Sequence, residues 1–234
     1  MSLCHYVIMS LCRVEFVGMS PCKHPINSQN IHKKNNKMNI QKQLLVFLIL
    51  GSSAAFAKQA PLVSIPTHDA FFSNIAQYCG KAFEGKVAVD NQPSPAFDAK
   101  LVMFVRKCDQ AELQIPFYVG DNASRTWIIK KTGSGLSLKH DHRHKEGTDD
   151  PVTMYGGHTQ GAGYNQIQSF PVDQYSKELF AQQGLPQSIT NTWQIYIYPE
   201  MFSYRLVREG REFRVDFDLT KPVSPPPAPW GYED

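Results

Sequence analysis

The stretch "REFRVDFDL", residues 211–219, carries the pattern that decides the fold. Phe213, Val215, Phe217 and Leu219 alternate with charged side chains along it. Side chains two apart on a β-strand lie on the same face. The stretch therefore predicts a strand with one apolar face toward a core and one face toward water.

The same alternation recurs along most of the chain from residue 82 onward. Gly210, in "REGRE", predicts a tight hairpin between the last two of these segments. Short strands joined mostly in sequence are typical of an antiparallel sandwich or barrel, and a closed barrel leaves no sheet edge exposed. We predict a mostly β fold, an antiparallel up-and-down barrel of about ten strands. The expected strands are residues 82–90, 100–108, 112–119, 125–131, 135–144, 151–156, 164–171, 190–198, 201–208 and 211–219.

Two segments have a helical pattern instead. In residues 67–80, "THDAFFSNIAQYCG", the apolar side chains fall on one helical face, and a helix here could plug one end of the barrel. Residues 172–184, "VDQYSKELFAQQG", predict one inserted short helix. The tail "KPVSPPPAPWGYED", residues 221–234, contains prolines that cannot donate ladder hydrogen bonds. We expect it to lie along the surface as polyproline II or to extend freely, outside the central sheet.

The N-terminal part reads as a targeting segment. "MNIQKQLLVFLILGSSAAFA", residues 38–57, has a short basic start, an apolar run and small residues ending in an A-x-A site. We predict a signal peptide cleaved after Ala57; the alternative is an uncleaved anchor. Residues 1–37 would then be a mis-assigned or disordered extension. One domain would span residues 58–222, followed by a Pro-rich tail at 223–234, in the periplasm or secreted.

The predicted mature chain is close to neutral, with 18 Lys and Arg residues against 20 Asp and Glu. Because it has no basic run, we expect no nucleic-acid partner. We also expect no stable membrane span once the signal is removed. Cys79 and Cys108 are its two cysteines. An even number of cysteines in an exported chain predicts a disulfide, and a hairpin turning near residues 91–96 would bring the two together.

The order of these segments also suggests a family resemblance. A leading helix, then "GKAFEGKV", residues 80–87, and a meander of strands resembles the calycin group of lipocalins and fatty-acid-binding proteins. The chain lacks the lipocalin G-x-W signature. Residues 125–157, 190–199 and 213–223 are similar to secreted bacterial proteins of uncharacterised function. The first resemblance implies a barrel fold, and neither implies an activity.

The stretch "LSLKHDHRH", residues 136–144, places three histidines in step with two leucines. If the leucines face the core, His140, His142 and His144 continue along the same face, into the barrel or at its mouth. The residues between them, such as Asp141 and Arg143, would then face water.

Three interpretations of these histidines remain open. In the first they are polar groups of a small-molecule pocket, since barrels often hold one small ligand. The glycine-rich "YGGHTQGAGYN", residues 155–165, is expected to be a flexible connection that could act as a lid over it. The expected pocket residues are His140, His142, His144, His158, Tyr155, Arg125, Trp127 and Trp193, with Tyr196 as a further candidate.

In the second interpretation the histidines bind zinc or another divalent metal. His140 and His142 would lie about 6.6 Å apart along the strand, close enough to share one ion. The third ligand would be His158, with Glu112 or Asp149 as alternatives. In the third interpretation the histidines form a polar rim bonded to carboxylates such as Asp141 or Glu146, without a ligand.

No serine lies in a nucleophile motif such as G-x-S-x-G, and no catalytic residue can be assigned. We therefore expect an exported small-molecule-binding barrel with a histidine-lined pocket rather than an enzyme. The alternatives are a metal-dependent or histidine-dependent enzyme of the bacterial envelope, or an envelope interaction protein without a ligand.

Overall fold

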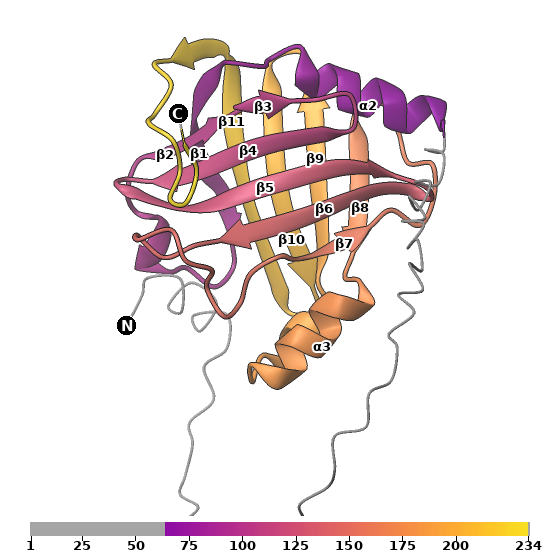
Figure 1. Ribbon diagram of the computed structural model, residues 1–234, viewed down its shortest axis with the longest axis vertical. Coiled ribbons are helices and arrows are strands. Elements are labelled where there is room, and N and C mark those ends of the chain that lie inside the picture. The colour runs from indigo at the N-terminus through magenta and orange to yellow at the C-terminus, as the bar shows by residue number, and fades with distance from the viewer. Residues whose placement is uncertain (1–63, 234) are drawn as a thin grey trace, which may run out of the picture. The chain divides into compact units, whose positions relative to one another are not determined.

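The computed structural model describes residues 64–233 (Figure 1). The predicted signal peptide at 38–57 and the extension at 1–37 lie outside the described residues. Within residues 64–233, no helix combines the length and the apolar character that crossing a lipid bilayer requires.

One antiparallel sheet forms the wall of a nearly closed barrel, as the alternation predicts. Ten strands follow the order β7-β6-β5-β4-β2-β1-β11-β10-β9-β8, and the short β3 adds to β4. An isolated bridge between Gly157 and Val172 joins the two ends of the sheet. The strands are β1 (Ala82–Asp90), β2 (Leu101–Phe104), β3 (Lys107–Cys108), β4 (Glu112–Val119), β5 (Asn122–Thr132), β6 (Gly135–His142), β7 (Tyr155–His158), β8 (Ile167–Pro171), β9 (Thr192–Tyr198), β10 (Met201–Arg208) and β11 (Arg211–Val223).

Two glycines allow the barrel to close where β7 meets its neighbours. A Cβ atom on Gly156 would lie 1.9 Å from the Leu138 carbonyl oxygen, and one on Gly157 would lie 2.2 Å from the Pro171 carbonyl oxygen. Only glycine lets the three backbones approach so closely. The first residues of "YGGHTQGAGYN" are therefore a strand, not the flexible connection that composition suggests.

The strand expected at 151–156 is wrong in its first four residues. Asp150 accepts a hydrogen bond from the backbone N–H of Val152, and Met154 has a φ of 54°, so the chain turns here. The strand begins only at Tyr155.

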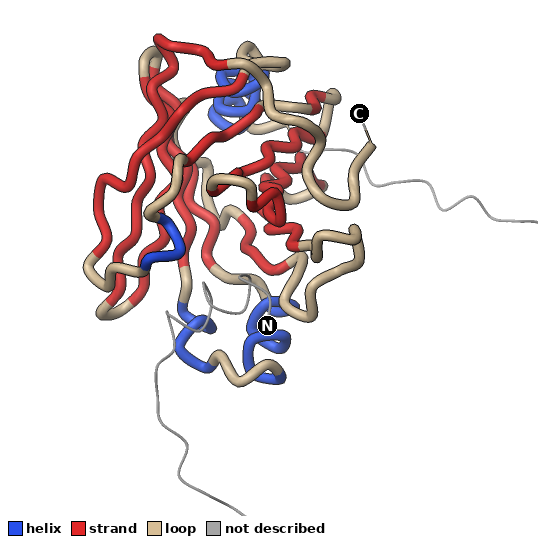
Figure 2. Tube along the Cα trace, turned by 90° about the vertical axis from the view of Figure 1, so that its left-hand side faces the viewer, coloured by secondary structure: helices blue, strands red, loops and turns tan. Residues whose placement is uncertain are grey.

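Helices lie at the two ends of the barrel (Figures 1 and 2). At one end, α2 (Pro66–Ala76) buries Phe71, Phe72 and Ile75 in the core, as the helical pattern predicts. At the other end, Asp173 caps α3 (Gln174–Gln182) by accepting from the backbone N–H of Ser176. Within residues 64–233, two 3₁₀ turns, η1 (Pro95–Phe97) and η2 (Pro186–Thr190), complete the helical elements.

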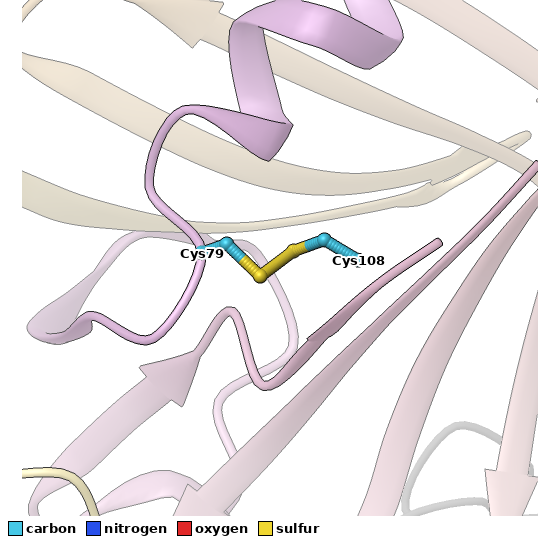
Figure 3. Close-up of a disulfide and its surroundings, with 2 residues drawn as sticks. All are labelled: Cys79 and Cys108. Atoms are coloured by element: carbon cyan, nitrogen blue, oxygen red, sulfur yellow. A yellow bond between two sulfur atoms is a disulfide. The ribbon is translucent and has the colours of Figure 1, made fainter. Parts of the chain in front are cut away.

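The predicted disulfide is confirmed. Cys79 follows α2, Cys108 lies in β3, and their Cα atoms are 6.2 Å apart (Figure 3). The bond fastens the helical end cap to the sheet. The strand expected at 100–108 is interrupted between β2 and β3, where the Val105 carbonyl accepts from the backbone N–H of Gly80.

The tail differs from the expectation at its start. Strand β11 continues through Pro222 to Val223, and Pro222 pairs with Phe83 of β1. The proline is tolerated because β10 ends opposite Asp218, so β11 has no neighbour on that side beyond this point.

Residues 224–233 then lie along the outer face of the sheet. The Tyr118 hydroxyl donates to the Pro227 carbonyl, and the Trp230 backbone N–H donates to the Ala123 carbonyl. Tyr232 donates its hydroxyl hydrogen to Asp141. As a result Asp141, expected to face water, is only 2% exposed.

We predict that Gly157→Val destabilises the barrel by at least about 2 kcal/mol. The new side chain would clash with backbone atoms of Phe170 and Pro171 in β8, which cannot move aside as a flexible side chain could. Urea unfolding measures the loss. Gly161→Val is the matched control, since nothing lies within 4 Å of a Cβ atom there. Equal stabilities for the two variants would contradict the role given to Gly157.

Candidate functional site

A cavity of about 70 Å³ lies inside the barrel at the end covered by α3. Phe180 of α3 and Ser188 of η2 line it together with inward-facing side chains of the wall. The ring-bearing apolar lining consists of Phe97, Phe117, Trp127, Phe180, Trp193 and Phe213. The polar lining consists of Gln92, Ser94, Arg125, His140, His142, Tyr155, Ser188, Asn191, Tyr204 and Arg211.

The sequence of strand β6 explains why the barrel interior is polar only at the end covered by α3. It starts beside α2, where a Cβ atom on Gly135 would lie 3.2 Å from His68, and runs toward α3. Its inward positions change from Leu136 and Leu138 to His140 and His142 along this path. The parity predicted from the two leucines is therefore confirmed as far as His142.

His140 is held by hydrogen bonds on both ring nitrogens. Its Nδ1 lies 3.2 Å from the Tyr155 carbonyl oxygen, and its Nε2 lies 2.8 Å from the Tyr204 hydroxyl. A carbonyl can only accept, so Nδ1 carries the hydrogen and Nε2 accepts from Tyr204. The ring also stacks on Tyr155, with centroids 4.7 Å apart and planes 10° from parallel. His140 is thus a fixed, neutral ring.

His142 lies two residues further along β6, toward the α3 end. Its Nε2 is 3.0 Å from the Tyr155 hydroxyl, and its backbone N–H donates to Thr153 Oγ1 at 2.7 Å. Tyr155 therefore contacts both histidines, the first through its carbonyl and ring, the second through its hydroxyl.

Burial keeps both imidazoles uncharged. It lowers the pKa of His140 to about 3, and it also holds the pKa of His142 well below its usual value, with help from the positive charge of Arg125. Burial likewise raises the pKa of Tyr204 well above its usual value. At neutral pH the two histidines and Tyr204 are all neutral hydrogen-bonding groups.

Aromatic rings form one continuous side of the cavity. Trp127 is parallel to Tyr204, with centroids 4.5 Å apart, and stacks on Phe117 at 5.0 Å. Trp193 lies at a tilt to both His140 and Tyr155, at 5.1 and 5.8 Å. These contacts fix the rings that a bound molecule would meet.

Two arginines also reach the cavity. Arg125 of β5 stands opposite His142 on the ladder, is 5% exposed, and donates from Nη1 to Asn122. Arg211 begins β11, is 4% exposed, and pairs with Asp90 through Nη1 at 2.5 Å.

Six of the eight predicted pocket residues come together around this cavity: His140, His142, Tyr155, Arg125, Trp127 and Trp193. His144 does not, because β6 ends at His142 and a bridge between Arg143 and Asp149 starts a turn. His158 is opposite Ser137 on the ladder, and its Nε2 bonds to Thr132 Oγ1 outside the cavity.

The structure therefore does not bring the predicted metal set of His140, His142 and His158 together. The alternative ligands have other partners: Glu112 pairs with Lys130, and Asp149 pairs with Arg143. Within residues 64–233, no group of three or more His, Cys, Asp or Glu side chains could hold a metal ion. Tyr196 bonds to Gln194 and does not line the cavity.

The third interpretation, a polar rim of histidines bonded to carboxylates, does not hold for His140. Asp141 accepts from Thr153, Arg143 and Tyr232, and Glu146 accepts from Thr148. The partners of His140 are instead a phenol and a carbonyl.

Sequence reasoning missed Tyr204 and Arg211. Both share strand parity with core residues, Tyr204 with Phe202 and Leu206, and Arg211 with Phe213. That parity was a usable signal, but an aromatic residue in such a position is typical of packing, and a charged residue is typical of the wet face.

Comparisons of the chain with protein-family models, with curated proteins and with solved structures found no match. The nearly closed antiparallel barrel is consistent with a calycin-like architecture. That likeness concerns the fold and carries no function.

The buried His140 predicts a specific pH dependence of stability. Its pKa is about 3 in the folded chain, against about 6.5 in an unfolded chain. Between these values only the unfolded chain takes up the proton, so the free energy of unfolding falls as pH decreases from 7.5 to 5. The expected contribution of His140 is about 1.4 kcal/mol per pH unit below about pH 6.

Denaturant unfolding at several pH values measures this slope. His140→Gln removes one of two buried imidazoles and should lower the slope by about 1.4 kcal/mol per pH unit, while His142 still contributes. His158→Gln controls for the loss of an imidazole outside the cavity. An unchanged slope in His140→Gln would show that the ring is protonated in the folded state.

Proposed function

We propose that the protein binds a small molecule in the cavity between His140, His142, Trp193 and Arg125. The proposal includes export, to the periplasm or the medium, and a place among secreted bacterial proteins. Binding rather than catalysis is its central claim.

The observation that carries the proposal is the change of the barrel interior from apolar to polar at one end. Burying histidine, tyrosine and arginine side chains costs free energy unless each finds partners, and an apolar filling would fold more readily. A concave site with apolar rings, a few convergent polar groups and shifted pKa values is typical of ligand binding. All three features occur together here.

The size of the cavity limits the ligand. A volume of about 70 Å³ is smaller than an engineered cavity of about 150 Å³ that holds benzene. It is ample for a few water molecules or for a molecule of a few non-hydrogen atoms. A long lipid of the kind that larger barrels enclose does not fit this volume.

Nothing in the geometry favours the enzyme alternative to the same degree. Both nitrogens of His140 are engaged, and with a pKa of about 3 the ring is a weak base at neutral pH. The neutral rings instead suit a static role, because their hydrogen bonds hold the hydroxyls of Tyr155 and Tyr204 in place in the cavity wall.

Filling the cavity should abolish binding. Leu206→Phe adds a ring to the lining, whereas Leu219→Phe makes the same change at an equally buried leucine, 6% exposed, that does not line the cavity. Small molecules extracted from the purified protein and identified by mass spectrometry supply the ligand, and titration measures its affinity.

We expect at least a tenfold loss of affinity in Leu206→Phe and none in Leu219→Phe, with circular dichroism confirming that both are folded. Equal affinities would remove the cavity as the binding site. A wild-type protein that yields no small molecule and binds none from a fragment library would refute the proposed function.

Export is tested separately. The Cys79–Cys108 disulfide supports it, since such bonds persist in oxidising compartments. N-terminal sequencing of the secreted product should read Lys58 first, the residue after the predicted cleavage site. A mature product that begins upstream of Lys58 would contradict this part of the proposal.

A further inference from the structure

The charges around the cavity have one sign. The described lining residues include two arginines, Arg125 and Arg211, and no Asp or Glu. Arginine stays protonated at any pH at which the protein is folded, while burial keeps His140 and His142 neutral. Asp90 offsets Arg211 in part, but it lies outside the lining. The interior therefore favours a negatively charged guest.

One N–H donor of Arg211 has no acceptor within the described residues. Its Nη1 is occupied by Asp90 and Asn91, but its buried Nε has no hydrogen-bond partner within the described part of the chain. An unsatisfied buried donor of this kind is destabilising, and more so when the group is charged. Arg211 lines the cavity, so an acceptor on a bound molecule that approaches its guanidinium would offset part of that cost.

The field of Arg125 reaches the polar end of the cavity as well. Arg125 stands opposite His142 on the β5–β6 ladder, and its positive charge is one of the causes that lower the pKa of His142. An anion bound near His142 would therefore interact with a buried guanidinium across a medium of low polarity, where charges attract strongly.

The rest of the lining selects against a bare inorganic anion. Trp127, Trp193, Phe213 and Leu206 offer apolar surface, and a fully hydrated ion such as phosphate would lose its water there without compensation. A carboxylate is planar, matches the guanidinium fork and can carry a hydrocarbon part.

We infer that the ligand is a short-chain carboxylate whose charged group is bound by the cavity arginines and whose hydrocarbon part packs against the indole and phenyl rings. This inference rests on the proposed function and narrows it to a class of ligand. The volume of about 70 Å³ favours acids of a few non-hydrogen atoms, such as acetate or propionate, over long-chain fatty acids.

The test compares each acid with its uncharged counterpart on the purified full-length protein. Acetate, propionate and butyrate are titrated beside acetamide, propionamide and butyramide, with inorganic phosphate and palmitate as further probes, by calorimetry or NMR. We expect the best acid to bind at least tenfold more tightly than its amide, and phosphate and palmitate to bind no better than the amides.

Variants of three arginines assign the contact. Arg125→Lys and Arg211→Lys keep the positive charge but lose the planar guanidinium that can donate two parallel hydrogen bonds to a carboxylate. Each should reduce the preference for acid over amide at least threefold. Arg214→Lys is the matched control, because Arg214 is paired with Asp216 on the outer face of β11. If Arg211→Lys fails to fold, the double variant Asp90→Asn, Arg211→Gln removes both members of the buried pair and tests the same loss.

Each outcome decides between the two proposals. An amide, phosphate or palmitate that binds as tightly as the best acid overturns the carboxylate inference but leaves ligand binding in place. Acid binding that survives in both cavity-arginine variants overturns the assigned contact. No binding by any of these probes, together with none from the fragment library, overturns the proposed function itself.

Discussion

The structure depends on one steric constraint, the close approach of three backbones at β7. Gly156 lies against Leu138 of β6, and Gly157 lies against Pro171 of β8, so the ends of the sheet meet. If the two ends of the sheet did not meet, the barrel would be open beside β7, and the inner face of β6 would be exposed to water. His140 and His142 are buried because the barrel closes beside them, and their low pKa values follow from that burial.

The polar end of the barrel is kept rigid by a small set of hydrogen bonds and ring contacts. His140 connects Tyr155 with Tyr204, and Tyr204 stacks on Trp127. Each of these side chains occupies an inward position on a different strand, so the contacts join the wall across its interior. Such a network is favourable only when its members are satisfied, and both ring nitrogens of His140 have partners. Arg211 belongs to a separate group with Asp90 and Asn91, and its buried Nε has no partner within the described part of the chain.

Much of the fold could be predicted from local patterns. Strands at 82–90, 112–119 and 201–208 have the predicted bounds because their alternation is regular and turns flank them. The inward direction of His140 and His142 followed from the leucines before them. The segment at 151–158 was misread because its pairing depends on a close backbone approach, which no local pattern shows.

The rest of the site depended on distant contacts. His144 leaves the cavity because the chain turns after His142, and His158 faces outward because of the register between β6 and β7. Asp141 is buried because Tyr232, far away in sequence, covers it. Arg211 was not predicted because a charged residue at a strand end is usually solvated. Its pairing with Asp90 and Asn91, which allows it to point inward, depends on contacts distant in sequence.

The two end caps of the barrel differ in how they are fastened. A covalent bond ties the chain after α2 to β3, whereas α3 is held by the Lys139–Asp173 ion pair, the Ser176 hydroxyl and the burial of Phe180. Fluctuations that part α3 from the wall break no covalent bond and so need less free energy than those at the opposite end. The α3 end, next to His140 and His142, is therefore the end at which the barrel interior opens more readily to the surrounding water.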